Sequence, residues 1–176
     1  HKGARWFAEN VLPLLDKKFE FVVVGKTWDK SEQDGLENKD RVNLVGYASD
    51  EVLAKLKSQT CLAVMPNKLS INQTDVEGFG LVASELSVQG IPLIASNIEG
   101  LTSAVINQKT GFLVPPDDIQ AWVAKINEIA TWDSAFREQY GANCRKLAVD
   151  YYNWERVADD TMTVYKKLCS VPSDNI

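Results

Sequence analysis

The stretch Glu77–Ser96, EGFGLVASELSVQGIPLIAS, holds the clearest fold signal in the chain. Its middle part has apolar residues at helical spacing, and Gly90 suits the left-handed residue that ends a helix. Ile91–Ser96 is predicted to be a strand that directly follows this helix. A helix that leads directly into such a strand predicts a β-α-β unit with parallel pairing.

The same alternation continues in both directions along the chain. Phe19–Gly25 is a continuous apolar run that ends in glycine, which is typical of a strand buried on both faces of a sheet. Further strands are predicted at Val42–Tyr47 and Cys61–Pro66, with a brief one inside 110–118. An opening helix is predicted with Trp6, Phe7, Val11 and Leu14 or Leu15 buried, and a second begins after the N-cap Ser49 with Val52, Leu53 and Leu56 buried. A short helix is predicted in 99–108, and a longer one is capped by Asp117 or Asp118 and runs to Ile129. Two more helices are predicted at Ser134–Tyr151 and Trp154–Leu168. The polar, glycine-containing segment 26–41 is predicted to be a loop, which can include a helical turn. The predicted fold class is α/β, a doubly wound parallel sheet with extra C-terminal helices.

Composition narrows the classes of function. The 176 residues suit one domain, and the net charge of -5 argues against nucleic-acid binding while leaving room for a small phosphate pocket. Cys61, Cys144 and Cys169 lack metal-ligand spacing, so we expect free thiols in the cytoplasm. The one histidine, His1, argues against a Ser-His-Asp triad or a histidine metal site within this chain. No apolar run approaches the roughly 20 residues of a membrane span.

The turn before the helix at 81–88 is suited to an anion. The first amides of a helix lack internal partners, and Gly78 and Gly80 leave the backbone bare, so a phosphate can approach the amides of Gly78–Leu81. Ligands of doubly wound sheets bind beyond the carboxyl ends of the strands, which is where this turn lies. Glycines are also common at helix starts without any function, so spacing alone leaves both interpretations open.

Glu77 and Glu85 lie on either side of this turn, roughly 12 Å apart along a helix. Carboxylates repel phosphate but accept hydrogen bonds from hydroxyl groups, and a nucleotide-sugar carries hydroxyls on both sides of its diphosphate. A glutamate early in a helix is also favourable without a ligand. Glu85 lies among apolar residues, so it needs either a partner or exposure to solvent. A metal held by Asp75 and Glu77 is disfavoured because no third ligand is evident, and we expect no metal.

Several segments resemble one known family. EGFGLVASE, Glu77–Glu85, resembles the Glu-x7-Glu signature of the family-four retaining glycosyltransferases of the GT-B fold. RVNLVGYASDEVLAKLKSQTCLAVMPN (41–67) resembles the family's segment before the signature, GIPLIASNIEGLTSAVINQKTGFLVPPDD (90–118) the one after it, and YNWERVADDTMTVYKKL (152–168) the closing helix. The resemblance covers most of the chain and keeps the family's order.

The resemblance implies the Rossmann-like, donor-binding carboxyl-terminal half of a GT-B enzyme, with a domain at 1–170 and a polar tail at 171–176. Glu77 would be the catalytic residue that contacts the transferred sugar, and Glu85 would hold the ribose hydroxyls. The implied donor-binding residues are Lys2, Gly46, Tyr47, Gly78, Phe79, Gly80, Leu81 and Glu85. Of these, Lys2 would bind phosphate and Gly46–Tyr47 would lie near the nucleobase. Without the resemblance, Lys2 is a solvated terminal charge and Tyr47 closes a strand. Trp28, Trp122, Trp132 and Trp154 are expected to be packing residues rather than sugar platforms.

Two parts of the family pattern are not in this sequence: the first strand with its arginine, upstream of Lys2, and the amino-terminal acceptor domain. The implied reaction is transfer of a hexose from a nucleotide-diphosphate sugar with retention of configuration, without a cofactor, and we expect this chain alone to be inactive. An acceptor at a membrane surface stays open, which would make the cytoplasmic enzyme peripheral. The alternatives are a nucleotide-sugar epimerase of similar fold, which would need further acid–base groups, and a non-catalytic nucleotide-sugar-binding or interaction domain.

Overall fold

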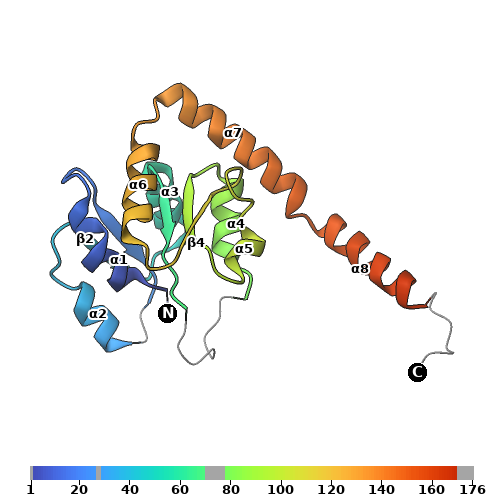
Figure 1. Ribbon diagram of the computed structural model, residues 1–176, viewed down its shortest axis with the longest axis horizontal. Coiled ribbons are helices and arrows are strands. Elements are labelled where there is room, and N and C mark those ends of the chain that lie inside the picture. Colours follow the sequence, from blue (N-terminus) through green and yellow to red (C-terminus); the bar gives the residue numbers. More distant parts are fainter. Residues whose placement is uncertain (1, 27–28, 70–77, 170–176) are drawn as a thin grey trace.

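The computed structural model describes residues 2–26, 29–69 and 78–169 and confirms an α/β fold with parallel strands. The strands in these ranges form two sheets, in which β1 (Phe21–Val24) pairs with β2 (Val42–Gly46), and β4 (Leu93–Ser96) lies between β3 (Ala63–Met65) and β5 (Phe112–Val114). Figure 1 shows helices packed around these strands and a last helix that extends away from them. The strand positions predicted from apolar runs are therefore confirmed.

The helices also lie close to their predicted places. Their bounds are α1 Ala4–Asn10, followed by the 3-10 turn η1 Leu12–Leu14, α2 Lys30–Leu36, α3 Asp50–Gln59, α4 Leu81–Val88, α5 Leu101–Ala104, α6 Ile119–Ala130, α7 Ser134–Tyr151 and α8 Trp154–Cys169. The side chains of Ser49 and Asp118 cap α3 and α6, which resolves the choice between Asp117 and Asp118. α2 forms where a loop was predicted, because Asp29 accepts a hydrogen bond from the Ser31 amide and caps a full helix.

The core has two parts, one on each side of the larger sheet's central strand. The first is built around Trp122, which is fully buried and meets the rings of Trp6 and Phe7 edge-on. The second is built around Leu93 and joins β4 to α4 and α5. Of the residues expected to point inward from the opening helix and the turn after it, Phe7, Val11 and Leu15 are buried, Trp6 is partly buried and Leu14 is exposed.

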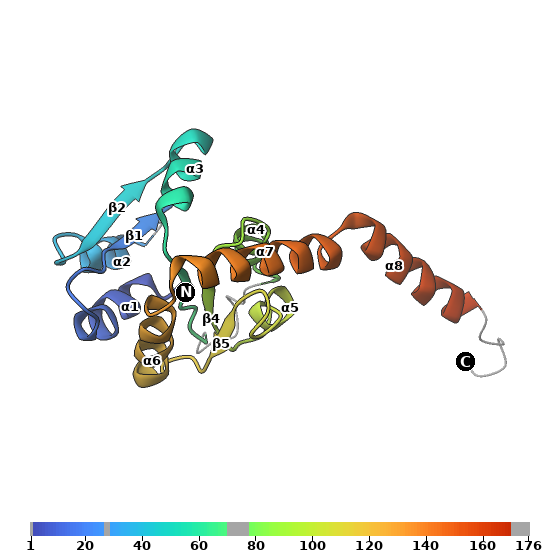
Figure 2. The ribbon, with the colours of Figure 1, turned by 90° about the horizontal axis from the view of Figure 1, so that it is seen from above.

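Three predictions of burial are wrong. In β1, Val22 and Val24 are each 38% exposed, because the described helices cover only the face of β1 that carries Phe21. α3 contains no buried residue, and Val52 is 44% exposed. Trp154 is 83% exposed rather than packed, because it begins α8, which extends away from the body in Figure 2. Among the described residues, no helix is both long and apolar enough to cross a membrane.

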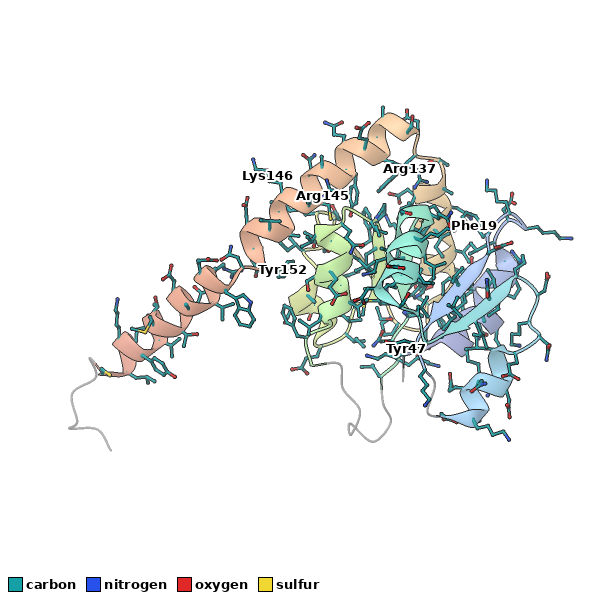
Figure 3. All side chains as sticks on the ribbon, turned by 180° about the vertical axis from the view of Figure 1, so that it is seen from behind. Phe19, Tyr47, Arg137, Arg145, Lys146 and Tyr152 are labelled. Atoms are coloured by element: carbon teal, nitrogen blue, oxygen red, sulfur yellow. The ribbon has the colours of Figure 1, made fainter. Side chains whose placement is uncertain are left out.

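α7 fixes the carboxyl end of α4. A Cβ added to Gly90 would lie 2.6 Å from the Gly141 carbonyl oxygen, so the two backbones touch without side chains between them. Arg145, labelled in Figure 3, donates hydrogen bonds to the carbonyl oxygens of Val88 (3.0 Å) and Gln89 (3.0 Å). These contacts cap the last turn of α4 and so position its opposite end.

Candidate functional site

The predicted donor-binding residues are found at the carboxyl ends of the strands and at the start of α4. Gly46 ends β2 with a φ of 68°, and Tyr47 follows it with 88% of its surface exposed. Figure 3 shows Tyr47 at this end of β2. Lys2 lies near the end of β3, because its neighbour Gly3 packs so tightly on Pro66 that a Cβ would collide with the Pro66 carbonyl oxygen.

The turn before α4 is bare and open. Gly80, the N-cap residue, has a φ of 72°, and no side chain caps the helix. A Cβ added to Gly78 would meet nothing within 4 Å. Phe79 is 39% exposed and Leu81 is 68% exposed, so solvent reaches the turn. Among the described residues, uncapped amides and the positive end of the helix dipole thus face an accessible space, as an anion site requires.

Glu85 lies one turn further along α4, and its surroundings differ from those expected. Its side chain is 59% exposed, and its Oε2 lies 3.6 Å from Lys57 Nζ on α3. The neighbouring Leu81, Val82 and Val88 are exposed as well, because α4 buries Ala83, Ser84, Leu86 and Ser87 instead. The expected apolar surroundings of Glu85 are therefore wrong. The sequence predicted that Glu85 would have either a partner or exposure to solvent, and the structure shows both. The carboxylate is accessible to hydroxyl groups and lies beside a cation.

Four residues named in the sequence predictions lie outside the described residues: His1, Trp28, Asp75 and Glu77. The catalytic role of Glu77 therefore stays a prediction. Within the described part of the chain, no group of three or more His, Cys, Asp or Glu side chains is arranged to hold a metal ion.

Every arginine of the chain donates a hydrogen bond to a backbone carbonyl oxygen within the fold. The donors are Arg5, Arg41, Arg137, Arg145 and Arg156. Arg137, for example, donates to the carbonyl oxygens of Ile129 (2.6 Å) and Cys61 (3.0 Å) and so joins α7 to α6 and to the chain before β3. These arginine contacts tie segments of the fold together.

Sequence reasoning did not find Lys57 or Tyr152. Tyr152 follows α7, meets the Phe79 ring edge-on at a centroid distance of 6.1 Å, and donates a hydrogen bond to the Ala104 carbonyl oxygen at 2.9 Å. Burial raises the pKa of Tyr152, so its hydroxyl stays protonated and able to donate. The only signal in the sequence was the position of Tyr152 within the segment that resembles the closing helix, and that resemblance gave no contact.

Comparisons with known proteins identify the family and the fold of the chain. The family model for glycosyl transferases group 1 matches residues 5–147. The glycogen synthase of Mycobacterium tuberculosis is 30% identical over 161 residues, which are 88% of this chain and 37% of that protein. Sucrose-phosphate synthase from Thermosynechococcus elongatus has a TM-score of 0.70 at 30% identity, covering 95% of this chain and 42% of that one. Anabaena HepE, solved in complex with UDP and glucose, has a TM-score of 0.67 at 22% identity, covering 97% and 45%.

The chain spans about a fifth to two fifths of the length of the curated relatives it matches. The family model nevertheless matches most of this chain, and the solved neighbours share its fold along nearly all of it. The chain therefore belongs to the glycosyl transferases group 1 family, and its Rossmann-like α/β fold is one half of the GT-B architecture.

Proposed function

We propose that this chain is the carboxyl-terminal, donor-binding half of a retaining family-four glycosyltransferase that transfers a hexose from a nucleotide-diphosphate sugar. The observation that carries this function is the open, uncapped turn at Gly78–Leu81 with the accessible carboxylate of Glu85 on the same helix. Family membership and the UDP and glucose held by Anabaena HepE support it.

Different residues contact different parts of the donor in this proposal. The amides at Phe79, Gly80 and Leu81 face the diphosphate, and Glu85 accepts hydrogen bonds from the ribose hydroxyls. As the bond between the sugar and the diphosphate breaks, negative charge grows on the leaving oxygen, where the helix dipole and Lys2 stabilise it. The acceptor oxygen bonds to the anomeric carbon on the same face, and its proton passes to the leaving phosphate. Glu77 is proposed to contact the sugar, and no metal or other cofactor takes part.

The split between the two sheets supports an incomplete domain. In the described structure β1 pairs only with β2, and β3 pairs only with β4. The packing of Gly3 on Pro66 places the start of α1 beside the end of β3, which is where a parallel strand preceding α1 would end. We propose that such an upstream strand joins the two sheets, that 1–170 is the donor domain, and that an upstream acceptor domain forms the other wall of the cleft. This chain alone then binds nucleotide weakly and transfers no sugar, and the complete enzyme works in the cytoplasm or at a membrane surface.

A thermal-shift titration of the 176-residue chain tests the function. UDP, GDP and ADP are each added at millimolar concentration, and one of them is expected to raise the Tm, because ligand stabilisation grows as RT ln(1 + [L]/Kd). Glu85→Gln should reduce that rise, whereas Glu128→Gln, at an exposed carboxylate on α6, should not. An unchanged Tm with all three nucleotides would contradict a donor site in this chain.

A further inference from the structure

Tyr152 connects the junction of α7 and α8 to the proposed donor site. Figure 3 shows Tyr152 at this junction, beside α4 and α5. Its ring lies at 77° to the Phe79 ring with 6.1 Å between the centroids, which is the edge-to-face arrangement that aromatic pairs prefer. Its hydroxyl reaches α5 through the hydrogen bond of 2.9 Å to the Ala104 carbonyl oxygen.

The turn itself has little to fix its conformation. Phe79 lies between two glycines, which restrict the backbone least, and α4 starts without a side-chain cap. The Phe79 ring is therefore the one side chain of 78–80 through which the fold can hold this backbone. Tyr152 is well placed for that task, because its amide is bonded to the Ala148 carbonyl oxygen at 2.8 Å and its hydroxyl to Ala104.

We propose that Tyr152 is a positioning residue of the donor site. Its ring holds Phe79, and Phe79 in turn holds the amides of Gly80 and Leu81 in the direction that a diphosphate requires. Tyr152 acts through Phe79 and needs no contact with the donor itself. The role rests on the proposed function of this turn and adds to it the way in which the turn is preorganised.

The ring and the hydroxyl of Tyr152 have separable effects. Tyr152→Phe keeps the ring contact with Phe79 and loses the hydrogen bond to Ala104, so we expect a lower Tm and a loss of nucleotide affinity clearly smaller than that of Tyr152→Leu. Tyr152→Leu loses the ring, and we expect the affinity to fall about threefold to tenfold, the size of an aromatic pair contact. Phe79→Leu should produce a similar fall, and the double variant should lose no more than either single one, because both remove the same contact.

The experiment is isothermal titration calorimetry of the 176-residue chain and its variants with UDP, GDP and ADP, alongside Tm measurements. Tyr165→Leu, which removes an exposed ring of α8, is the matched control and should bind as the unaltered chain does. If Tyr152→Leu does not fold, Phe79→Leu at its partly exposed position tests the same contact. Unchanged affinity in Phe79→Leu, strictly additive losses, or equal losses in Tyr152→Phe and Tyr152→Leu would each overturn the role of Tyr152. If the unaltered chain binds none of the three nucleotides, the proposed function fails first, and the positioning role fails with it.

Discussion

Lys57 on α3 places its Nζ 3.6 Å from Oε2 of Glu85 on α4. The lysine side chain is only 17% exposed, whereas the glutamate side chain is 59% exposed. A pair with one partner in solvent adds about 0–1 kcal/mol to stability. The ion pair therefore matters mainly for position. Lys57 keeps the Glu85 carboxylate beside α3, and the exposed part of the carboxylate stays accessible to hydroxyl donors.

Glu85→Gln is expected to weaken nucleoside diphosphate binding about tenfold, because hydrogen bonds to a charged acceptor contribute about 1.5–3 kcal/mol and the amide is a weaker acceptor. The Tm should change little, since the Glu85 side chain is 59% exposed and a pair with one partner in solvent adds only about 0–1 kcal/mol. Calorimetric titration with UDP, GDP and ADP measures the affinity. Glu128→Gln, which removes the partner of Lys125 on α6, is the control, and an equal loss in both variants would contradict a specific role for Glu85.

Alanine variants of Gly78 and Gly80 distinguish two effects of a side chain in this turn. At Gly78 the added methyl group obstructs the approach of the ligand, and at Gly80 it also strains the backbone. Gly78 has free space around a Cβ, so we expect its alanine variant to keep the free energy of unfolding within about 0.5 kcal/mol but to bind nucleotide less tightly. Gly80 has a φ of 72°. Its alanine variant should therefore lose about 1–2 kcal/mol of stability as well as affinity. Urea unfolding gives the stability, and Gly78→Ala with full affinity would mean that the anion does not approach on that side.

Local signals in the sequence were enough for much of the fold. Apolar runs gave the strand positions, and the short polar side chains of Ser49 and Asp118 marked the starts of α3 and α6. Periodicity shows which face of an element is apolar, but not whether another element covers it. For this reason the exposure of Val22 and Val52 could not be predicted.

Residue types predicted the open turn of the candidate site, but they did not predict the side-chain contacts around it. The bare turn at Gly78–Leu81 follows from residue types alone. Lys57 meets Glu85, and Tyr152 meets Phe79, only after distant segments pack together, and no local pattern encodes such pairs.

Gly141→Ala is expected to destabilise the protein by about 1–3 kcal/mol, because the added methyl group would overpack a tight contact. Its Cβ would lie 2.9 Å from the Gly90 carbonyl oxygen, and α7 would have to move away from α4. This cost opposes the gain in helix propensity of about 1 kcal/mol that alanine brings. Urea unfolding followed by tryptophan fluorescence measures the change. The control is Asn143→Ala, at an exposed position of the same helix, which should shift the free energy of unfolding by less than about 0.5 kcal/mol. If Gly141→Ala shifts the free energy of unfolding by no more than this control does, α7 and α4 tolerate separation.

Tyr140 should make the protein sensitive to alkali. Burial raises the pKa of Tyr140 above its ordinary value of 10.0, and its hydroxyl has no hydrogen-bond partner in the described structure. The unfolded chain releases this proton near pH 10 while the folded chain retains it, so the stability is complete below pH 10 and is lost as the pH rises above it. Tyr140→Phe should therefore flatten the fall in Tm above pH 10, and at neutral pH it should leave the Tm equal or higher, because an unpaired buried hydroxyl is removed. Tyr165→Phe, on exposed α8, should leave the alkaline profile unchanged, and a profile for Tyr140→Phe that follows the unaltered chain would exclude Tyr140 as the cause.

Ending the chain after Asn153, which removes α8, is expected to leave the folded body intact. α8 contributes no buried residue among those described, and its apolar side chains are exposed, Trp154 at 83% and Leu168 at 65%. Because almost no apolar surface returns to water, the free energy of unfolding should change by less than about 1 kcal/mol. Nucleotide affinity should also persist, since Tyr152 and its contact with Phe79 remain.

A chain that ends after Asp133 is the contrasting control: it also loses α7 with Arg137, Arg145 and the buried Cys144, and it should not fold. If the shorter deletion lowers the Tm as far as the longer one, α8 supports the body through contacts other than core burial.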